Sequence, residues 1–121
     1  RKESSAASDV YKRQLMSEIP VYMIANLVVR DADEYRKYEK GFFPILKRFG
    51  GEFVTYDDGH ENLEGSEPIK GRIILFKFPS EQAAKDWYND DEYQALSEFR
   101  RVGTHLNSLT LVHGLQPRNT D

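Results

Sequence analysis

Arg72 is the residue of this sequence with the clearest capacity for chemistry, because it opens an otherwise apolar segment, residues 72–78 (RIILFKF). A guanidinium is costly to bury without a partner, and it can hold a carboxylate or enolate oxygen through two hydrogen bonds. We therefore predict that Arg72 binds the anionic oxygen of a ligand. A structural ion pair with Glu64 or Glu52 is the alternative that the sequence leaves open.

Two residues of the polar segment 58–70 could move a proton next to such a ligand. Glu64 carries a carboxylate that could serve as a general base, and His60 has a side chain that titrates near neutral pH. Glycines in this segment would let it close over a pocket. Each residue could instead be a solvated loop side chain, and Glu64 could also pair with Arg72 or Arg100.

Polar and aromatic side chains elsewhere in the chain could form the walls of that pocket. Asn26 lies midway along an apolar segment, where its amide could orient a ligand or bond to a neighbouring strand. Tyr38, Tyr56 and Trp87 could supply aromatic walls, although aromatic residues at such spacings also build ordinary cores. Together with Arg100, these residues are the predicted ligand-binding set.

Hydrophobic periodicity predicts the elements that must position these residues in the first half of the chain. Residues 20–29 (PVYMIANLVV) are apolar at nearly every position, which predicts a strand buried on both faces. Asp31 and Glu34 have the spacing of a capping box. Apolar residues then recur every three or four positions, which predicts a helix that ends at Gly50 or Gly51.

Two shorter helices are predicted in the second half of the chain. Ser80 can cap the first, whose apolar face includes Trp87. Asp91 and Gln94 have the spacing of a second capping box, so a further helix is expected to begin there and to end at Gly103.

The fold class follows from adding the remaining strands, which are predicted at residues 52–57, 72–78 and 106–113. The resulting βαββαβ order is typical of the α+β, ferredoxin-like arrangement, a four-stranded antiparallel sheet with its helices on one face. The strands at 20–29 and 72–78 are nevertheless apolar on both faces, and soluble monomers avoid such a large exposed apolar patch. We therefore predict a homodimer in which two sheets face each other and form an α/β barrel.

The chain resembles a known family, the domain of unknown function family 1330, within the dimeric α/β-barrel (ferredoxin-like) superfamily. The resemblance extends from Pro20 to Gly114, and the residues that carry it are Tyr35, Tyr38, Gly50, Gly51, Leu63, Glu64, Gly65, Arg72, Phe78, Pro79, Ser80, Ala83, Trp87, Tyr88, Tyr93 and Arg100. It implies a homodimer with a pocket between sheet and helices, and no assigned reaction. The segment from Asp57 to His60 departs from the family pattern, in which a more basic, glycine-rich stretch is expected.

Composition and termini limit the remaining possibilities. The sequence contains no cysteine, which excludes disulfides, thiolate metal sites and cysteine nucleophiles, and its net charge of −3 is unfavourable for binding nucleic acid. No segment has the roughly 18 consecutive apolar residues of a membrane helix. We expect residues 1–15 to be a leader outside the fold, residues 16–114 to be the domain, and residues 115–121 to be a frayed tail.

Two functional hypotheses remain. The first is a cytoplasmic enzyme that acts on a small organic acid or phenol and that uses neither a cofactor nor a metal. In it Arg72 holds the anionic oxygen and Glu64 or His60 moves the proton. The second is a non-catalytic homodimeric module that binds a metabolite or a protein. A filled space beneath the sheet and a fully paired Arg72 would favour the second hypothesis.

Overall fold

The computed structural model describes residues 19–116, and its elements follow the predicted βαββαβ order. They are β1 (Val21–Val29), α2 (Ala32–Arg48), β2 (Glu52–Asp57), β3 (Arg72–Phe78), α3 (Glu81–Asn89), α4 (Asp91–Gly103) and β4 (Thr104–His113). The last strand thus begins at Thr104 rather than at residue 106. Within residues 19–116 no helix is long and apolar enough to cross a membrane. The expected leader and residues 117–121 of the expected tail lie outside the described residues.

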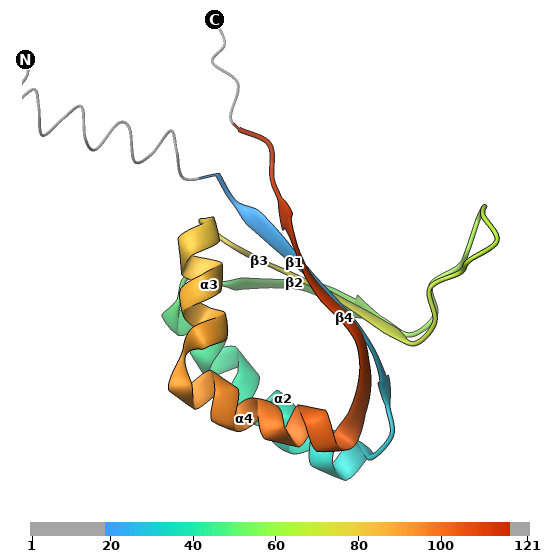
Figure 1. Ribbon diagram of the computed structural model, residues 1–121, viewed down its shortest axis with the longest axis horizontal. Helices are drawn as coiled ribbons and strands as arrows, with labels where there is room; N and C mark the ends of the chain where they lie inside the picture. The colour runs from blue at the N-terminus through green and yellow to red at the C-terminus, as the bar shows by residue number, and fades with distance from the viewer. Residues whose placement is uncertain (1–18, 117–121) are drawn as a thin grey trace, which may run out of the picture.

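The four strands form one antiparallel sheet in the order β2-β3-β1-β4. All three helices cover the same face of this sheet, and the β2–β3 loop projects away from it (Figure 1). Directly paired residues of antiparallel strands share a face. The pairing of Leu27 with Arg72 and of Ala25 with Ile74 therefore places all four side chains on the helix-covered face. This α+β fold confirms the predicted ferredoxin-like class.

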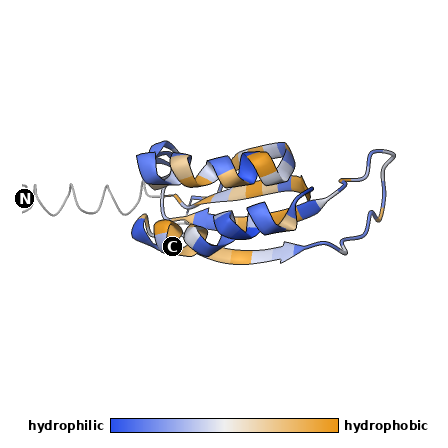
Figure 2. Ribbon diagram, turned by 90° about the horizontal axis from the view of Figure 1, so that it is seen from below, coloured by the Kyte–Doolittle hydropathy of each residue, from blue (hydrophilic) through white to orange (hydrophobic). Residues whose placement is uncertain are grey.

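The core lies between the sheet and the helices. It is dominated by aromatic side chains, and Trp87, Tyr93 and Phe78 are among its largest fully buried members. The ring centroids of Trp87 and Tyr93 are 4.2 Å apart, a contact that ties α3 to α4. In Figure 2 the strands carry much of the hydrophobic colour, whereas the helices also carry long hydrophilic stretches. The amphipathic helices thus bury their apolar stripes against the sheet, as their periodicity predicts.

The beginning of α2 is capped by one half of the predicted capping box. The Asp31 carboxylate accepts hydrogen bonds from the backbone N–H groups of Asp33 and Glu34. The Glu34 carboxylate does not complete the box, because it binds the Lys37 ammonium at 2.6 Å. The Asp31 N–H instead donates to the carbonyl of Gly103 at 3.0 Å. A tertiary contact between α4 and α2 therefore replaces the local bond that the sequence predicts.

The N-cap of α4 is Asp90, so the predicted cap at Asp91 is wrong. The Asp90 carboxylate accepts a hydrogen bond from the Tyr93 N–H at 3.0 Å, and Asp91 is the first helical residue. The Gln94 amide, which was predicted to close a capping box, donates to the carbonyl of Tyr88 at 2.6 Å. The N-cap lies one residue before the predicted position. Both positions carry an Asp side chain, so the sequence alone does not distinguish them.

The second face of the sheet carries no helix from the described part of the chain. Tyr22 and Val28 of β1 and Val112 of β4 on this face are each 40% exposed, and Ile73 and Leu75 of the neighbouring β3 are half-buried. The sheet therefore carries apolar side chains on both of its faces, as the sequence predicts.

Candidate functional site

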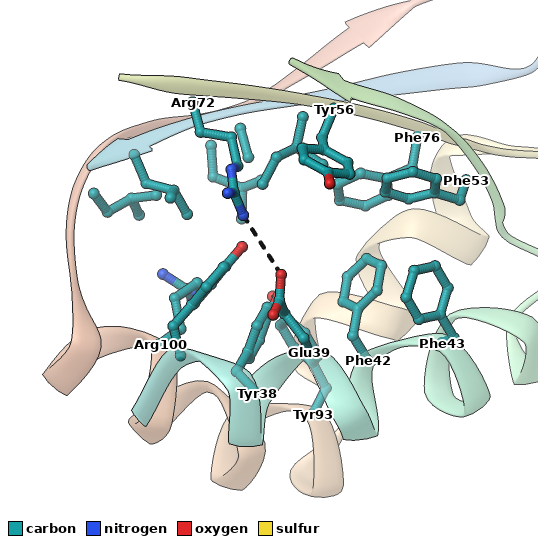
Figure 3. Close-up of a pocket in the computed structure, with 16 residues that line it drawn as sticks. Tyr38, Glu39, Phe42, Phe43, Phe53, Tyr56, Arg72, Phe76, Tyr93 and Arg100 are labelled. Carbon is teal, nitrogen blue, oxygen red and sulfur yellow. Dashed lines mark hydrogen bonds and ion pairs between the residues drawn. The ribbon is translucent and has the colours of Figure 1, made fainter. Parts of the chain in front are cut away.

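A cavity of about 320 Å³ lies between the helix-covered face of the sheet and helices α2 and α4. A cavity of this size can hold a small organic molecule. Its wall is apolar and rich in aromatic rings, and its charged members are Glu39, Arg72 and Arg100 (Figure 3). The lining residues are Ala25, Leu27, Tyr35, Tyr38, Glu39, Phe42, Phe43, Phe53, Tyr56, Arg72, Ile74, Phe76, Tyr93, Arg100, Leu106 and Leu109.

Arg72 reaches from the sheet into this cavity, where it is paired with two carboxylates. Its Nε and Nη2 atoms donate to the two Asp58 carboxylate oxygens at 2.8 and 3.0 Å, and Nη1 lies 3.5 Å from Glu39 Oε2 (Figure 3). These hydrogen bonds lower the pKa of the Asp58 carboxyl. The structural partners of Arg72 are therefore Asp58 and Glu39, and the alternative pairing with Glu64 or Glu52 is wrong.

Arg100 is the second cation of the cavity, and its environment is different. It lies in the last turn of α4 and is only 4% exposed. Among residues 19–116, no hydrogen bond or carboxylate reaches its guanidinium, and its Nε is a buried donor without a partner. The guanidinium carbon lies 5.6 Å from the ring centre of Tyr38, a cation–π contact. Arg100 is thus a buried cation without a counter-ion in the described chain.

The helix end offsets only part of the free energy that this burial requires. A cation in the last turn of a helix is favoured by about 0.3–1 kcal/mol, because the carbonyls there carry partial negative charge. Taking an ion out of water requires several kcal/mol, even after relaxation and water penetration. An anion that entered the cavity would supply the missing compensation.

The tyrosines that the helices contribute to the wall are Tyr35, Tyr38 and Tyr93, and their hydroxyls add to its polar part. The Tyr38 and Tyr93 hydroxyl oxygens are 2.7 Å apart, and both side chains are buried. The Tyr35 ring stacks on that of Tyr38 with their centres 5.7 Å apart. Burial raises the pKa of Tyr38 well above its ordinary value, and burial, followed by the Glu39 charge, raises that of Tyr35 to about 12. The raised pKa values keep the phenols of Tyr35 and Tyr38 protonated near neutral pH.

The two predicted proton carriers lie outside the cavity lining. His60 is held within the β2–β3 loop, where its Nε2 lies 2.6 Å from the carbonyl oxygen of Ile69. Glu64 is exposed on the same loop. Across residues 19–116, no three His, Asp or Glu side chains come close enough to hold a metal ion.

Asn26 and Trp87, two members of the predicted ligand-binding set, also lie outside the cavity lining. The Asn26 amide donates to the carbonyls of Lys70 and Arg72 at 2.7 and 3.1 Å, and it accepts from Asn107 at 3.0 Å. It therefore fixes the end of the β2–β3 loop against β1. Trp87 is completely buried in the core.

The structure brings four of the predicted site residues together around the cavity, namely Arg72, Arg100, Tyr38 and Tyr56. It adds Glu39, which the sequence analysis missed. The only sequence signal was its position one helical turn after Tyr35, which places both side chains on neighbouring parts of one helix face. A carboxylate on the edge of an apolar stripe is usually solvated, so this signal is weak.

The sequence from residue 20 to residue 115 matches the family described as domain of unknown function (DUF1330). The chain belongs to the DUF1330 family. The matched range includes every element from β1 to β4 and therefore the whole cavity of this DUF1330 protein. This result confirms the resemblance found in the sequence. No curated protein matches the chain.

Solved structures of similar fold include RPA0582, a protein of unknown function from Rhodopseudomonas palustris. It is 19% identical to this DUF1330 chain with a TM-score of 0.64, over 98% of this chain and 97% of that one. SnoaB, a cofactor-independent oxygenase from Streptomyces nogalater, is 13% identical with a TM-score of 0.57, over 84% of this chain and 96% of that one. At these identities the likeness shows the fold alone.

Proposed function

We propose that this DUF1330 protein binds a small organic acid with an aromatic body in the cavity and acts on it as a cofactor-free enzyme. The observation that carries the proposal is Arg100, a buried cation with no counter-ion within residues 19–116, on the wall of an aromatic cavity. A ligand carboxylate would neutralise this charge, and the aromatic wall would cover the rest of the ligand.

Arg72 takes a secondary role in this proposal. Two of its three guanidinium nitrogens are held by Asp58, whereas the carboxylate contact of Nη1 among residues 19–116 is the longer one of 3.5 Å with Glu39. A ligand oxygen could therefore compete with Glu39 for Nη1. Arg100 is then the principal anchor of the acid, and Arg72 is a second contact from the sheet side of the cavity.

Catalysis is the part of the proposal that depends on the remaining polar groups. Glu39 supplies a carboxylate, and Tyr35 and Tyr38 supply protonated phenols next to the place where we expect the acid to bind. SnoaB, whose fold this chain shares, is a cofactor-independent oxygenase, so the proposal assigns the chain a kind of chemistry that this fold can host. A specific observation favours the alternative, a non-catalytic binding module. The pairing of Arg72 with Asp58 occupies the predicted anion clamp, and His60 and Glu64, the predicted proton carriers, lie outside the cavity lining.

Either function is proposed for a homodimer that forms through the open face of the sheet. Tyr22, Val28 and Val112 expose apolar surface there, and Ile73 and Leu75 of the neighbouring β3 are half-buried on the same face. A second copy of the same face would cover this surface through two-fold pairing of the sheets.

Ligand binding is tested by isothermal titration calorimetry with phenylacetate, and with phenylacetamide as its neutral counterpart. The native protein should bind the acid and not the amide. Arg100→Met should weaken binding of the acid at least tenfold, because a hydrogen bond to a charged group contributes about 1.5–3 kcal/mol. Arg36→Met is the matched control, because Arg36 is exposed on α2 and, among residues 19–116, pairs only with Asp33. Equal binding of the acid to the native and Arg100→Met proteins would show that the anchor is wrong.

Catalysis is tested on an acid that binds. The complex is incubated in air and in D2O, and the acid is then analysed by mass spectrometry for added oxygen or exchanged hydrogen. A mass change that Glu39→Gln abolishes supports the enzyme. Unchanged acid after many binding lifetimes supports the non-catalytic module.

A further inference from the structure

The hydroxyl groups of Tyr38 and Tyr93 form a polar pair that the anchoring of a carboxylate leaves unused. Their oxygens are 2.7 Å apart, and the two residues are 6% and 1% exposed. Tyr38 comes from α2 and Tyr93 from α4, and both residues line the cavity (Figure 3). The pair therefore lies on the helical side of the space in which the proposed ligand would bind.

Counting hydrogen atoms shows that this pair has one donor to spare. Each phenol carries a single O–H hydrogen, and one of the two hydrogens is used in the bond between the oxygens. The structure gives the second hydrogen no acceptor among residues 19–116. A buried donor that loses its bond to water and gains none is unfavourable, so this hydrogen needs an acceptor in the cavity. Tyr38 is the more exposed partner and is therefore the better placed donor.

The spare donor lies next to the proposed carboxylate anchor. The guanidinium carbon of Arg100 is 5.6 Å from the ring centre of Tyr38, so the cation and the phenol border the same part of the cavity. A ligand held by Arg100 would therefore place the atoms nearest its carboxylate close to the hydroxyl pair.

We infer that the ligand is a 2-oxo acid, whose carboxylate binds Arg100 and whose neighbouring carbonyl oxygen accepts the hydrogen bond from Tyr38. This inference rests on the proposed function and names its ligand class. A carbonyl oxygen only accepts hydrogen bonds, so it matches a spare donor without adding another. A 2-hydroxy acid would bring one more O–H group into the apolar cavity, and an unsubstituted acid would leave the Tyr38 donor unsatisfied.

The test compares three acids that differ at one carbon atom, namely phenylacetate, mandelate and phenylglyoxylate. Titration calorimetry with the native protein should show phenylglyoxylate binding about three- to tenfold more tightly than phenylacetate, which is the usual contribution of one neutral hydrogen bond. Mandelate should bind more weakly than phenylglyoxylate. In Tyr38→Phe this preference should fall below twofold, while the affinity for phenylacetate stays within twofold of the native value.

Two further variants make the result specific. Tyr22→Phe is the matched control, because Tyr22 lies on the open face of the sheet and should keep the full preference. Tyr93→Phe removes the partner hydroxyl but leaves Tyr38 as a donor, so it should keep more of the preference than Tyr38→Phe does. If Tyr38→Phe does not fold, the comparison in the native protein decides, and phenylglyoxylate binding no more tightly than phenylacetate then counts against the inference.

The outcomes separate this inference from the proposed function. If phenylacetate binds in an Arg100-dependent way and the oxo acid has no advantage, the second contact is wrong and the proposed function stands. If the oxo acid is preferred and Tyr38→Phe keeps that preference, the contact is also wrong. If none of the acids binds, both proposals are overturned.

Discussion

Replacing Arg100 with methionine should make the ligand-free protein more stable, although it removes the proposed anchor. Methionine has a similar length and no charge to desolvate, and a lone ion in such a buried place costs about 3 kcal/mol by the lower estimates. The substitution also removes the cation–π contact with Tyr38, worth about 1 kcal/mol, and the favourable helix-end interaction, worth somewhat less. The expected net gain is about 1 kcal/mol.

For a domain of about 100 residues, this gain corresponds to a rise in Tm of about 5 °C. Thermal unfolding followed by circular dichroism measures it directly. Arg36→Met should change Tm by less than about 2 °C, because an exposed ion pair contributes little. If Arg100→Met unfolds several degrees below the native protein, the guanidinium is well satisfied without a ligand. The physical basis for an anion in the cavity would then be lost.

Four further results are expected. The pKa of Tyr35 is about 12 in the folded protein and about 10 in the unfolded chain. The free energy of unfolding should therefore keep its full value below pH 10 and fall by up to about 2 kcal/mol as the pH rises to 12. Urea unfolding of Tyr35→Phe should show less of this alkaline loss, and an equal loss would assign it elsewhere. Gly103→Ala places a Cβ 2.9 Å from the backbone N of Tyr35, so it should lower the unfolding free energy by about 1–3 kcal/mol, and an unchanged Tm would contradict this packing. Light scattering should give about twice the chain mass of 14.1 kDa, and Leu75→Asp should halve that value; a native monomer would refute the dimer. Asp58→Asn should free the Nε and Nη2 atoms of Arg72 and tighten phenylacetate binding about threefold or more. If titration calorimetry shows no change in affinity, these two atoms do not reach the acid.

The fold was largely predictable because its signals are local. The two apolar strands are found within one residue of their predicted positions, since nearly every side chain in them is apolar. The caps were harder to predict, because a cap competes with tertiary partners. The Asp31 N–H is bound by the carbonyl of Gly103, and no pattern around residue 31 contains this information.

The candidate site was only partly predictable, because it depends on which charges meet across the fold. Arg72 was correctly expected to be costly to bury alone, but several acidic residues could have been its partner. The choice of Asp58 follows from the pairing of β2 with β3, which brings the start of the loop beside Arg72. Arg100 had no such local signal, since a cation in the last turn of a helix is ordinary.

The segment from Asp57 to His60 connects these two results. It is the segment in which the resemblance led us to expect a more basic, glycine-rich stretch, and it supplies the carboxylate that neutralises Arg72. Asp58 already neutralises Arg72, the cation that opens β3. Arg100, on the opposite side of the cavity, is then the cation that lacks a counter-ion among residues 19–116. The identity of one loop residue can thus decide which wall of the cavity holds the acid, and therefore which end of a ligand faces the tyrosines.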